Sequence, residues 1–235
     1  MSFVQDVIIL FWISMQILVC NDDGVESPIL EALALMLKPY GEVLVIAPKD
    51  NQSAKSHSIN IENHDESMLH LVKEVDNIKF YSQPYTPVQS VLFCLEFTNF
   101  KPDLVVSGIN KGYNLGIDTF YSGTVAIARE ACLRGISSLA FSMAYDYCEN
   151  DLIYLKKMLS IIMDNHLYSK KYSLNINIPK NINNFKYQFC FVDNLYCNKN
   201  TDVKAIKDGI ISISPLTIQM TDCDALNDLN ENFDI

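Results

Sequence analysis

The sequence has few positive charges, and its cysteines form none of the close pairs that bind zinc or carry redox chemistry. Lys and Arg number 18 against 28 Asp and Glu, which gives a formal net charge of −10. Nucleic acid and anionic membrane surfaces repel such a chain at long range, so we expect neither as a partner. The seven cysteines are odd in number and contain no CxxC motif. This pattern indicates reduced thiols in a reducing compartment rather than a disulfide framework or a zinc site.

Positive charge is also absent from the N-terminal stretch. No Lys or Arg precedes Lys38, and Asp6 lies where a signal peptide carries basic residues. The apolar run of residues 7–20 is interrupted by Ser14 and Gln16 and is short for a membrane span. We interpret its first part as an extension ahead of the folded domain, with a membrane-tethered form using residues 7–20 as the alternative.

Neither an internal repeat nor a long linker divides the 235 residues, so the chain is predicted to form one domain with short appendages. Residues 1–14 are predicted to be a non-native or disordered extension. Residues 15–222 are predicted to form the α/β domain, and residues 223–235 an acidic, solvated tail.

Strands and helices alternate along the chain. A buried strand is predicted at 16–20, an amphipathic helix within 25–37 and a second buried strand at 42–48, which together form a βαβ unit with parallel strands. Pro28 lies in the first turn of the helix, where its missing N–H is tolerated. Further strands are predicted at 58–63, 68–75, 78–83, 103–108, 137–143, 172–179 and 208–216, and further helices at 86–97, 124–135 and 151–163.

Polar loops follow three of these strands. The loops read NDDG (21–24), KDNQS (49–53) and SGINKGYNLG (107–116). Because loops that follow parallel strands leave the sheet along one edge, where ligands bind, we expect these three segments to meet there.

The side chains gathered at that edge offer only oxygen donors. Asp22, Asp23, Ser53 and Asn110 supply carboxylate, hydroxyl and amide oxygens, the set that Mg²⁺ or Mn²⁺ accepts. A divalent ion would also stabilise two adjacent carboxylates as anions. The alternative for NDDG is a plain turn, since Asn, Asp and Gly are all turn formers.

A second motif, YSGTVAIARE, provides a place for an anion. Ser122, Gly123 and Thr124 fall at the start of a predicted helix, whose free N–H groups and dipole attract negative charge. Ser122 or Thr124 could instead simply cap the helix, and the two roles are compatible. Asn114 lies in the neighbouring glycine-containing loop, where the backbone can approach a ligand closely.

With these motifs in order, the chain resembles the SurE family of metal-dependent 5′-nucleotidases. The similarity rests on ILVCNDDGVESP, VIAPKDNQSAKSHS, PDLVVSGINKGYNLG, YSGTVAIAREA, LNINIP and TDVKAIKDGIISISPL, which cover most of residues 15–222. The resemblance departs at YTPVQS, where Tyr85 replaces a glycine and Gln89 an acid, and after NLG, where Ile117 replaces an acidic residue.

The resemblance implies a Rossmann-like three-layer sandwich with a mostly parallel sheet and a C-terminal β-hairpin extension, here shortened. It implies one divalent ion per subunit, Mg²⁺ or Mn²⁺, held by Asp22, Asp23, Ser53 and Asn110. It also implies phosphate-side contacts from Asn21 and the Ser122–Gly123–Thr124 turn. A homodimer or homotetramer in the cytoplasm is the assembly and location that it implies.

The function predicted from these features is hydrolysis of nucleoside 5′-monophosphates to nucleoside and phosphate. Asp22 or Asp23 would act as base or nucleophile, and the sequence does not choose between these roles. The alternative is a nucleotide-binding or regulatory module that keeps the metal site without efficient turnover. His57, in the loop after the second strand, is interpreted as a solvated side chain without a catalytic role.

Overall fold

The apolar runs of the sequence form the strands of one nine-stranded sheet in the computed structural model, which describes residues 15–62, 64–180, 182–195, 197 and 199–232. The predicted extension, residues 1–14, lies outside the described residues. The strands are β1 (Gln16–Cys20), β2 (Glu42–Pro48), β3 (His70–Val75), β4 (Ile78–Gln83), β5 (Leu104–Lys111), β6 (Ser137–Met143), β7 (Ser173–Ile178), β8 (Tyr187–Phe189) and β9 (Ile211–Leu216).

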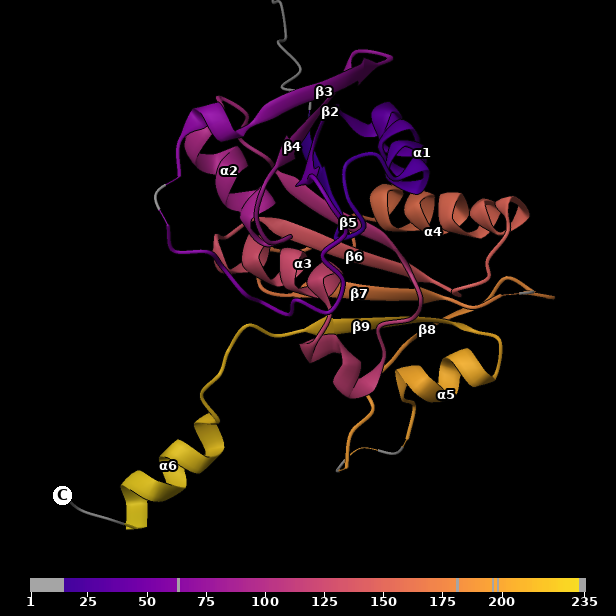
Figure 1. The fold of residues 1–235 in the computed structure, drawn as a ribbon. Helices are drawn as coiled ribbons and strands as arrows, with labels where there is room; N and C mark the ends of the chain where they lie inside the picture. Colours follow the sequence, from indigo (N-terminus) through magenta and orange to yellow (C-terminus); the bar gives the residue numbers. More distant parts are fainter. Residues whose placement is uncertain (1–14, 63, 181, 196, 198, 233–235) are drawn as a thin grey trace, which may run out of the picture.

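The sheet is mostly parallel. Its strand order is β3-β4-β2-β1-β5-β6-β7-β9-β8, and six of its eight strand pairings are parallel (Figure 1). Only β3 with β4 and β7 with β9 pair in the antiparallel sense. The chain is therefore of the predicted α/β class.

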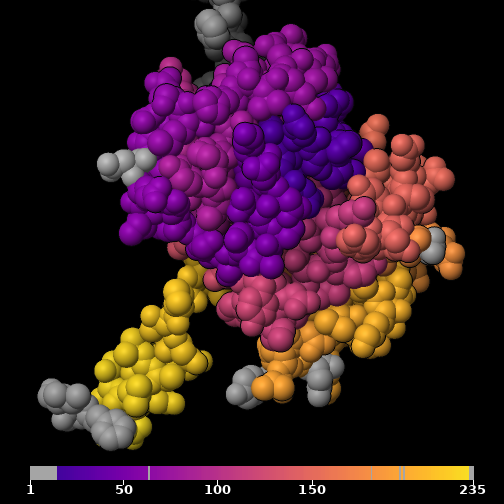
Figure 2. All heavy atoms as spheres, in the orientation of Figure 1, coloured from indigo at the N-terminus to yellow at the C-terminus, as the bar shows by residue number. Residues whose placement is uncertain are grey.

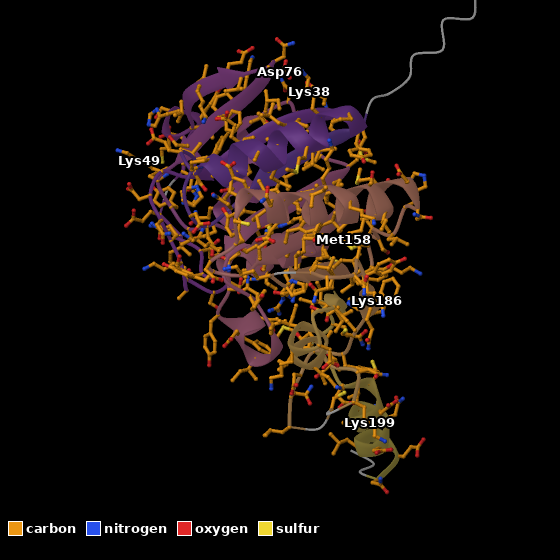
Figure 3. The ribbon with its side chains drawn as sticks, turned by 90° about the vertical axis from the view of Figure 1, so that its right-hand side faces the viewer. Lys38, Lys49, Asp76, Met158, Lys186 and Lys199 are labelled. Carbon is orange, nitrogen blue, oxygen red and sulfur yellow. The ribbon has the colours of Figure 1, made fainter. Side chains whose placement is uncertain are left out.

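Helices cover both faces of the sheet (Figures 1 and 3). The covering helices are α1 (Pro28–Leu37), α2 (Gln89–Phe97), α3 (Gly123–Leu133), α4 (Leu152–Asp164) and α5 (Asp202–Lys207), whereas α6 (Cys223–Asn232) projects away from the sheet. Figure 3 labels Met158 on α4, whose side chain is fully buried against the sheet.

The alternation of side chains along β1 explains the three layers. Ile17 and Val19 belong to the hydrophobic cluster that α1 and α4 cover, whereas Leu18 and Cys20 belong to the cluster under α2 and α3. A strand buried on both faces is usually apolar along its length, and this run accordingly shows no polar alternation.

Three details differ from the sequence prediction. The segment 58–63 is not a strand in its described residues 58–62, and Ile61 is 90% exposed. Helix α5 was not predicted, because six residues are too few for a helical period to show. The expected C-terminal hairpin takes another form, in which β8 is parallel to β9 and α5 lies between them in the chain.

None of the helices in the described residues combines the length and hydrophobicity that a membrane span needs. Residues 16–20, the last part of the stretch considered as a tether, form β1 between β2 and β5.

Candidate active site

The turn after β1 presents the two aspartates and is held by the side chain of Asn21. Its Nδ2 donates to the Gly24 carbonyl over 3.1 Å, and its Oδ1 accepts from the Gly24 N–H over 3.2 Å. Gly24 has φ +109°, a conformation that side chains with a Cβ rarely adopt. Asn21 is fully buried, so the structure uses both ends of its amide to shape the NDDG turn.

Asp22 and Asp23 carry an electrostatic cost that their neighbours among the described residues offset only in part. Burial raises the pKa of Asp22, although the Thr124 hydroxyl donates to its Oδ1 over 2.6 Å. Burial and the neighbouring Asp22 charge raise the pKa of Asp23 to about 6, and the positive charge of Lys111 lowers it only in part. A cation bound between them would remove this cost.

The three polar loops come together at the carboxyl edge of the sheet. Asp22, Ser53 and Asn110 line one cavity of about 250 Å³, and Asn114 and Ser122 line it with them. The remaining lining residues are Ala54, Lys111, Tyr113, Asp118 and Tyr121. These residues come from loops far apart in the sequence, as the parallel sheet requires.

Asp23 lies beside this cavity and is connected to Ser53 through Asn51. The Asn51 Nδ2 donates to Asp23 Oδ1 over 3.3 Å, and the Asn51 Oδ1 accepts from the Ser53 N–H over 3.0 Å. The loop after β2 is therefore tied to the turn after β1 by side chains as well as by the Gln52 N–H, which donates to the Asp22 carbonyl over 2.8 Å.

The start of α3 packs directly against Asp22. Ser122 is the N-cap, and its Oγ accepts from the Val125 N–H over 3.1 Å. A Cβ at Gly123 would lie 2.8 Å from Asp22 Oδ2, so only glycine fits here without displacing that carboxylate. Ser122 thus caps the helix and lines the cavity at once.

Asn114 is held by side chains that the sequence analysis did not single out. Its N–H donates to Asn177 Oδ1 and its Nδ2 to Ser142 Oγ, each over 2.8 Å. Its carbonyl accepts from the Nδ2 atoms of Asn175 and Asn177. The two asparagines of β7 are fully buried, and their position in an otherwise apolar strand, LNINI, was the signal that could have identified them.

Asp202 is a further residue that sequence reasoning missed. This fully buried carboxylate accepts from the Gly116 N–H over 3.0 Å and from the Asp193 N–H over 2.9 Å. Gly116 opens the short 3₁₀ helix Gly116–Phe120, which leads into Ser122. The C-terminal part of the chain therefore anchors the loop that precedes α3.

The donors around the cavity suit a hard divalent cation. The described residues contain no group of three or more His, Cys, Asp and Glu that could hold a metal, and a cation at the two aspartates would need neutral oxygens to complete its ligands. The Asn110 Nδ2 donates to the Gly112 carbonyl over 2.8 Å, which leaves its Oδ1 available. Neither a thiol nor an imidazole lines the cavity. Asp22, Asp23, Ser53 and Asn110 thus fit Mg²⁺ or Mn²⁺.

His57 is not the solvated side chain that we expected. Its Nε2 lies 2.8 Å from the Glu130 Oε2 on α3, and the imidazole side chain is 28% exposed. The partner residue lies 73 positions away in the sequence, so no local pattern could indicate this contact.

Fold and cavity together define an α/β protein whose oxygen-lined ligand site lies at the carboxyl edge of a parallel sheet, beside a helix N-terminus. The family described as "Survival protein SurE" matches residues 17–197. The chain belongs to the SurE family, as the resemblance indicated.

Curated relatives cover almost the whole chain. A protein of Clostridium beijerinckii named 5′-nucleotidase SurE is 33% identical, over 94% of this chain and 100% of its own length. A 5′/3′-nucleotidase SurE of Wigglesworthia glossinidia brevipalpis is 36% identical, over 94% of this chain and 98% of its own length. The crystal structure of the Sure protein from Aquifex aeolicus superposes with a TM-score of 0.75 at 29% identity, covering 93% of this chain and all of that one.

Proposed function

We propose that the protein is a metal-dependent phosphomonoesterase that hydrolyses nucleoside 5′-monophosphates to nucleoside and phosphate. The names of the curated relatives support the reaction. The observation that carries the proposal is the cavity in which Asp22, Ser53 and Asn110 lie next to the N-cap of α3. Oxygen donors for a cation and free N–H groups for an anion are the two halves of a phosphoryl-transfer site.

The proposed metal ligands are Asp22, Asp23, Ser53 and Asn110, with one Mg²⁺ or Mn²⁺ per subunit. When bound, this ion would polarise the phosphoryl oxygens and make a water molecule more acidic. The backbone N–H of Gly123 would stabilise negative charge on the phosphoryl oxygens, whereas the Thr124 N–H donates to the Asp22 carboxylate and helps to hold it.

Other residues of the site orient these groups. Thr124 holds Asp22 by a hydrogen bond at Oδ1, so Asp22 is the more firmly positioned carboxylate. Among the described side chains, Asn51 alone holds Asp23, over 3.3 Å, so Asp23 is the better placed to accept a proton from water. Asn21 acts by shaping the turn after β1, since both ends of its amide are engaged with Gly24, and Asn114 lines the cavity while its N–H and Nδ2 hold it in place.

The test is phosphate release from a panel of nucleoside monophosphates in the presence of Mn²⁺ or Mg²⁺, with and without excess chelator. We expect metal-dependent release from the 5′-monophosphates and a loss of at least about 100-fold in the Asp23→Asn variant, which keeps the shape of the side chain but removes the negative charge. Nucleotide binding without release would instead support the alternative of a regulatory module, in which the changes at Tyr85 and Gln89 matter.

We also propose a homodimer or homotetramer in the cytoplasm. All seven cysteines are free thiols, which suits a reducing compartment. Exposed apolar side chains gather around β8, where Phe189 is 56% and Phe191 65% exposed. These residues line a cavity of about 370 Å³ with Cys190, Val192 and Pro215, a surface that a second subunit would cover.

A further inference from the structure

The loop after β2 carries Ser53 and has no regular secondary structure between residues 51 and 62. Ala54 and Ser56 have positive φ values of 58° and 56°, conformations that non-glycine residues seldom adopt. Most of the residues in this segment are exposed. Its placement beside the aspartates therefore depends on a few polar contacts rather than on apolar packing.

Two of these contacts bind the loop to the end of the 3₁₀ helix Gly116–Phe120. The Ser56 N–H donates to the Tyr121 carbonyl over 3.0 Å, and the Ser56 Oγ donates to the Phe120 carbonyl over 2.5 Å. Both partners are backbone atoms of the segment that immediately precedes Ser122. The loop that carries Ser53 is thus tied to the segment just before the proposed phosphate contacts at the start of α3.

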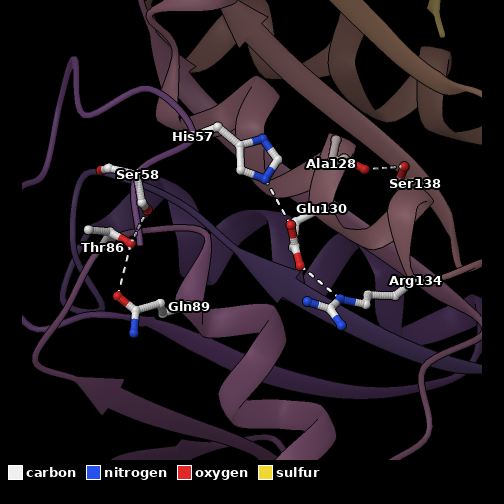
Figure 4. Close-up of polar contacts among 8 residues, drawn as sticks. All are labelled: His57, Ser58, Thr86, Gln89, Ala128, Glu130, Arg134 and Ser138. Carbon is white, nitrogen blue, oxygen red and sulfur yellow. Dashed lines mark hydrogen bonds and ion pairs between the residues drawn. The ribbon is translucent and has the colours of Figure 1, made fainter. Parts of the chain in front are cut away.

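The next residue, His57, reaches α3 itself (Figure 4). Its Nε2 lies 2.8 Å from Glu130 Oε2, while the other carboxylate oxygen of Glu130 accepts from the Arg134 Nε over 2.8 Å. The hydrogen bond from His57 and then the Arg134 contacts hold the pKa of Glu130 below its usual value. Glu130 is 6% exposed, so this carboxylate is fixed in place and stays ionised at neutral pH.

The position of Glu130 connects the two halves of the site. Glu130 lies on α3, the helix whose N-terminal residues face Asp22. Its partner His57 lies four positions after Ser53 in the sequence. We propose that Glu130 is a positioning residue: through His57 it holds the Ser53 loop against α3 and so sets the affinity of the site for a divalent ion. It does not contact the substrate. This inference rests on the proposed function.

A separate anchor holds the far half of the loop, as Figure 4 also shows. The Thr86 Oγ1 donates to the Ser58 carbonyl over 2.6 Å, and the Gln89 Oε1 accepts from the Asn60 N–H over 2.8 Å. Loss of the Glu130 contact therefore removes one anchor of the half-loop that carries Ser53, whose Ser56 contacts remain, and leaves the part after Ser58 in place. The expected effect is a local change at the cation site without loss of the fold.

The experiment measures Mn²⁺ binding to the full chain by electron paramagnetic resonance, together with the Tm of the metal-free protein. We expect Glu130→Ala and His57→Ala each to weaken Mn²⁺ binding about tenfold, the range that second-layer partners of metal ligands have. The double variant should be no weaker than either single one, because both remove the same contact. Glu130→Gln, which still offers an oxygen to His57, should recover most of the affinity.

Arg134→Ala is the matched control. It removes the other partner of the same carboxylate, on a residue whose side chain is 52% exposed, and leaves the His57 contact intact. We expect its Mn²⁺ affinity to stay within twofold of the wild type even where its Tm falls. If Glu130→Ala does not fold, His57→Ala tests the same contact from the loop side, where the side chain is less buried than that of Glu130.

Wild-type Mn²⁺ affinity in both Glu130→Ala and His57→Ala would overturn the positioning role. An equal loss of affinity in Arg134→Ala would also overturn it, because the variants would then weaken α3 in general. A wild-type protein that binds no Mn²⁺ would overturn it as well. A wild-type protein that binds Mn²⁺ but releases no phosphate would contradict the proposed function alone, because the binding readout is independent of turnover.

Discussion

Two adjacent carboxylates at the end of a buried strand are costly for this protein in its metal-free form. Asp22 is 3% exposed and adjoins Asp23, whose pKa rises to about 6. In the unfolded chain such a carboxyl titrates near 3.8. A group whose folded-state pKa is raised disfavours folding once it ionises, so stability contributed at low pH is lost as the pH rises from about 3.8 through 6.

Replacing Asp23 by Asn should therefore stabilise the metal-free protein at pH 7.5. After allowance for partial exposure we expect a gain of about 1 kcal/mol, equivalent to about 3 °C in Tm. The gain should shrink at pH 5, where the wild-type carboxyl is mostly protonated. Differential scanning calorimetry with chelator at both pH values makes the measurement.

Added Mn²⁺ provides the control for this stability prediction. It should raise the Tm of the wild type, because a ligand that binds only the native state stabilises it, and should raise that of Asp23→Asn far less. A metal-free variant that is less stable than the wild type at pH 7.5 would contradict the assignment of an uncompensated charge to Asp23.

At the scale of elements, α3 combines a structural and a functional role. Its N-terminus faces the cavity, its Thr124 holds Asp22, and its Glu130 receives the loop that carries Ser53. Residues Val125 to Ala128 and Ala131 are buried under the sheet, so the helix cannot shift without disturbing the core. A rigid helix with three site contacts is well suited to hold ligands that come from different loops.

Gly123→Ala tests this close approach of helix and turn. Alanine favours a helix by about 1 kcal/mol over glycine, so the substitution would stabilise an isolated helix. Here the added Cβ would lie 2.8 Å from Asp22 Oδ2 and must displace it. We expect Mn²⁺ affinity and phosphate release to fall by about tenfold or more, as measured by titration and steady-state assay.

Leu133→Ala is the control for this variant, because the leucine is 54% exposed at the other end of α3. It should leave metal binding unchanged. Full activity in Gly123→Ala would show that Asp22 can move without harm and would remove α3 from the positioning of the site.

At the scale of the whole molecule, the C-terminal part of the described chain exposes a projecting helix and an apolar sheet edge. Helix α6 projects from the body of the protein and buries none of its residues (Figures 1 and 2). The apolar side chains of Phe189 and Phe191 lie on the edge strand β8 and the segment that follows it. An exposed apolar edge of a sheet is a place where a second chain can associate.

We expect size-exclusion chromatography with light scattering to give two or four times the chain mass of 26.7 kDa. The double variant Phe189→Asp, Phe191→Asp should shift the mass to that of one chain, because burying two carboxylates at an interface is unfavourable. Ile153→Asp, at a residue 66% exposed on α4, is the matched control and should keep the wild-type mass. A single-chain mass for the wild type would contradict the proposed assembly.

Much of the fold could be predicted because the local signals agree with the final structure. The runs 16–20, 42–48 and 137–143 coincide with β1, β2 and β6. The segment 58–63 was predicted wrongly, because alternating Ile and Asn resemble a strand although Ile59 and Ile61 are both exposed. Alternation shows that a strand is possible, but only a neighbouring strand or core decides whether it forms.

The candidate site was likewise predictable in part: its proposed ligands could be found from the sequence, but the residues that hold them could not. Asp22, Ser53 and Asn110 could be placed together from the sequence, since Asp22 and Ser53 follow β1 and β2 and Asn110 lies at the end of β5, which extends three residues beyond the predicted strand end at 108. The partners that hold them could not. Glu130 for His57 and Asn177 for Asn114 lie 73 and 63 residues away, on elements that become neighbours only when the sheet is assembled.

The sequence by itself determined the α/β class and predicted the edge of the sheet that carries the candidate site and the oxygen chemistry of its donors, because strand periodicity and residue type are local properties. The tertiary structure alone decided which side chains hold those donors in position, such as Asp202 at the Gly116 N–H and Glu130 at His57. Such contacts join residues that share no local pattern, so they exist only once packing has brought distant segments within hydrogen-bond distance.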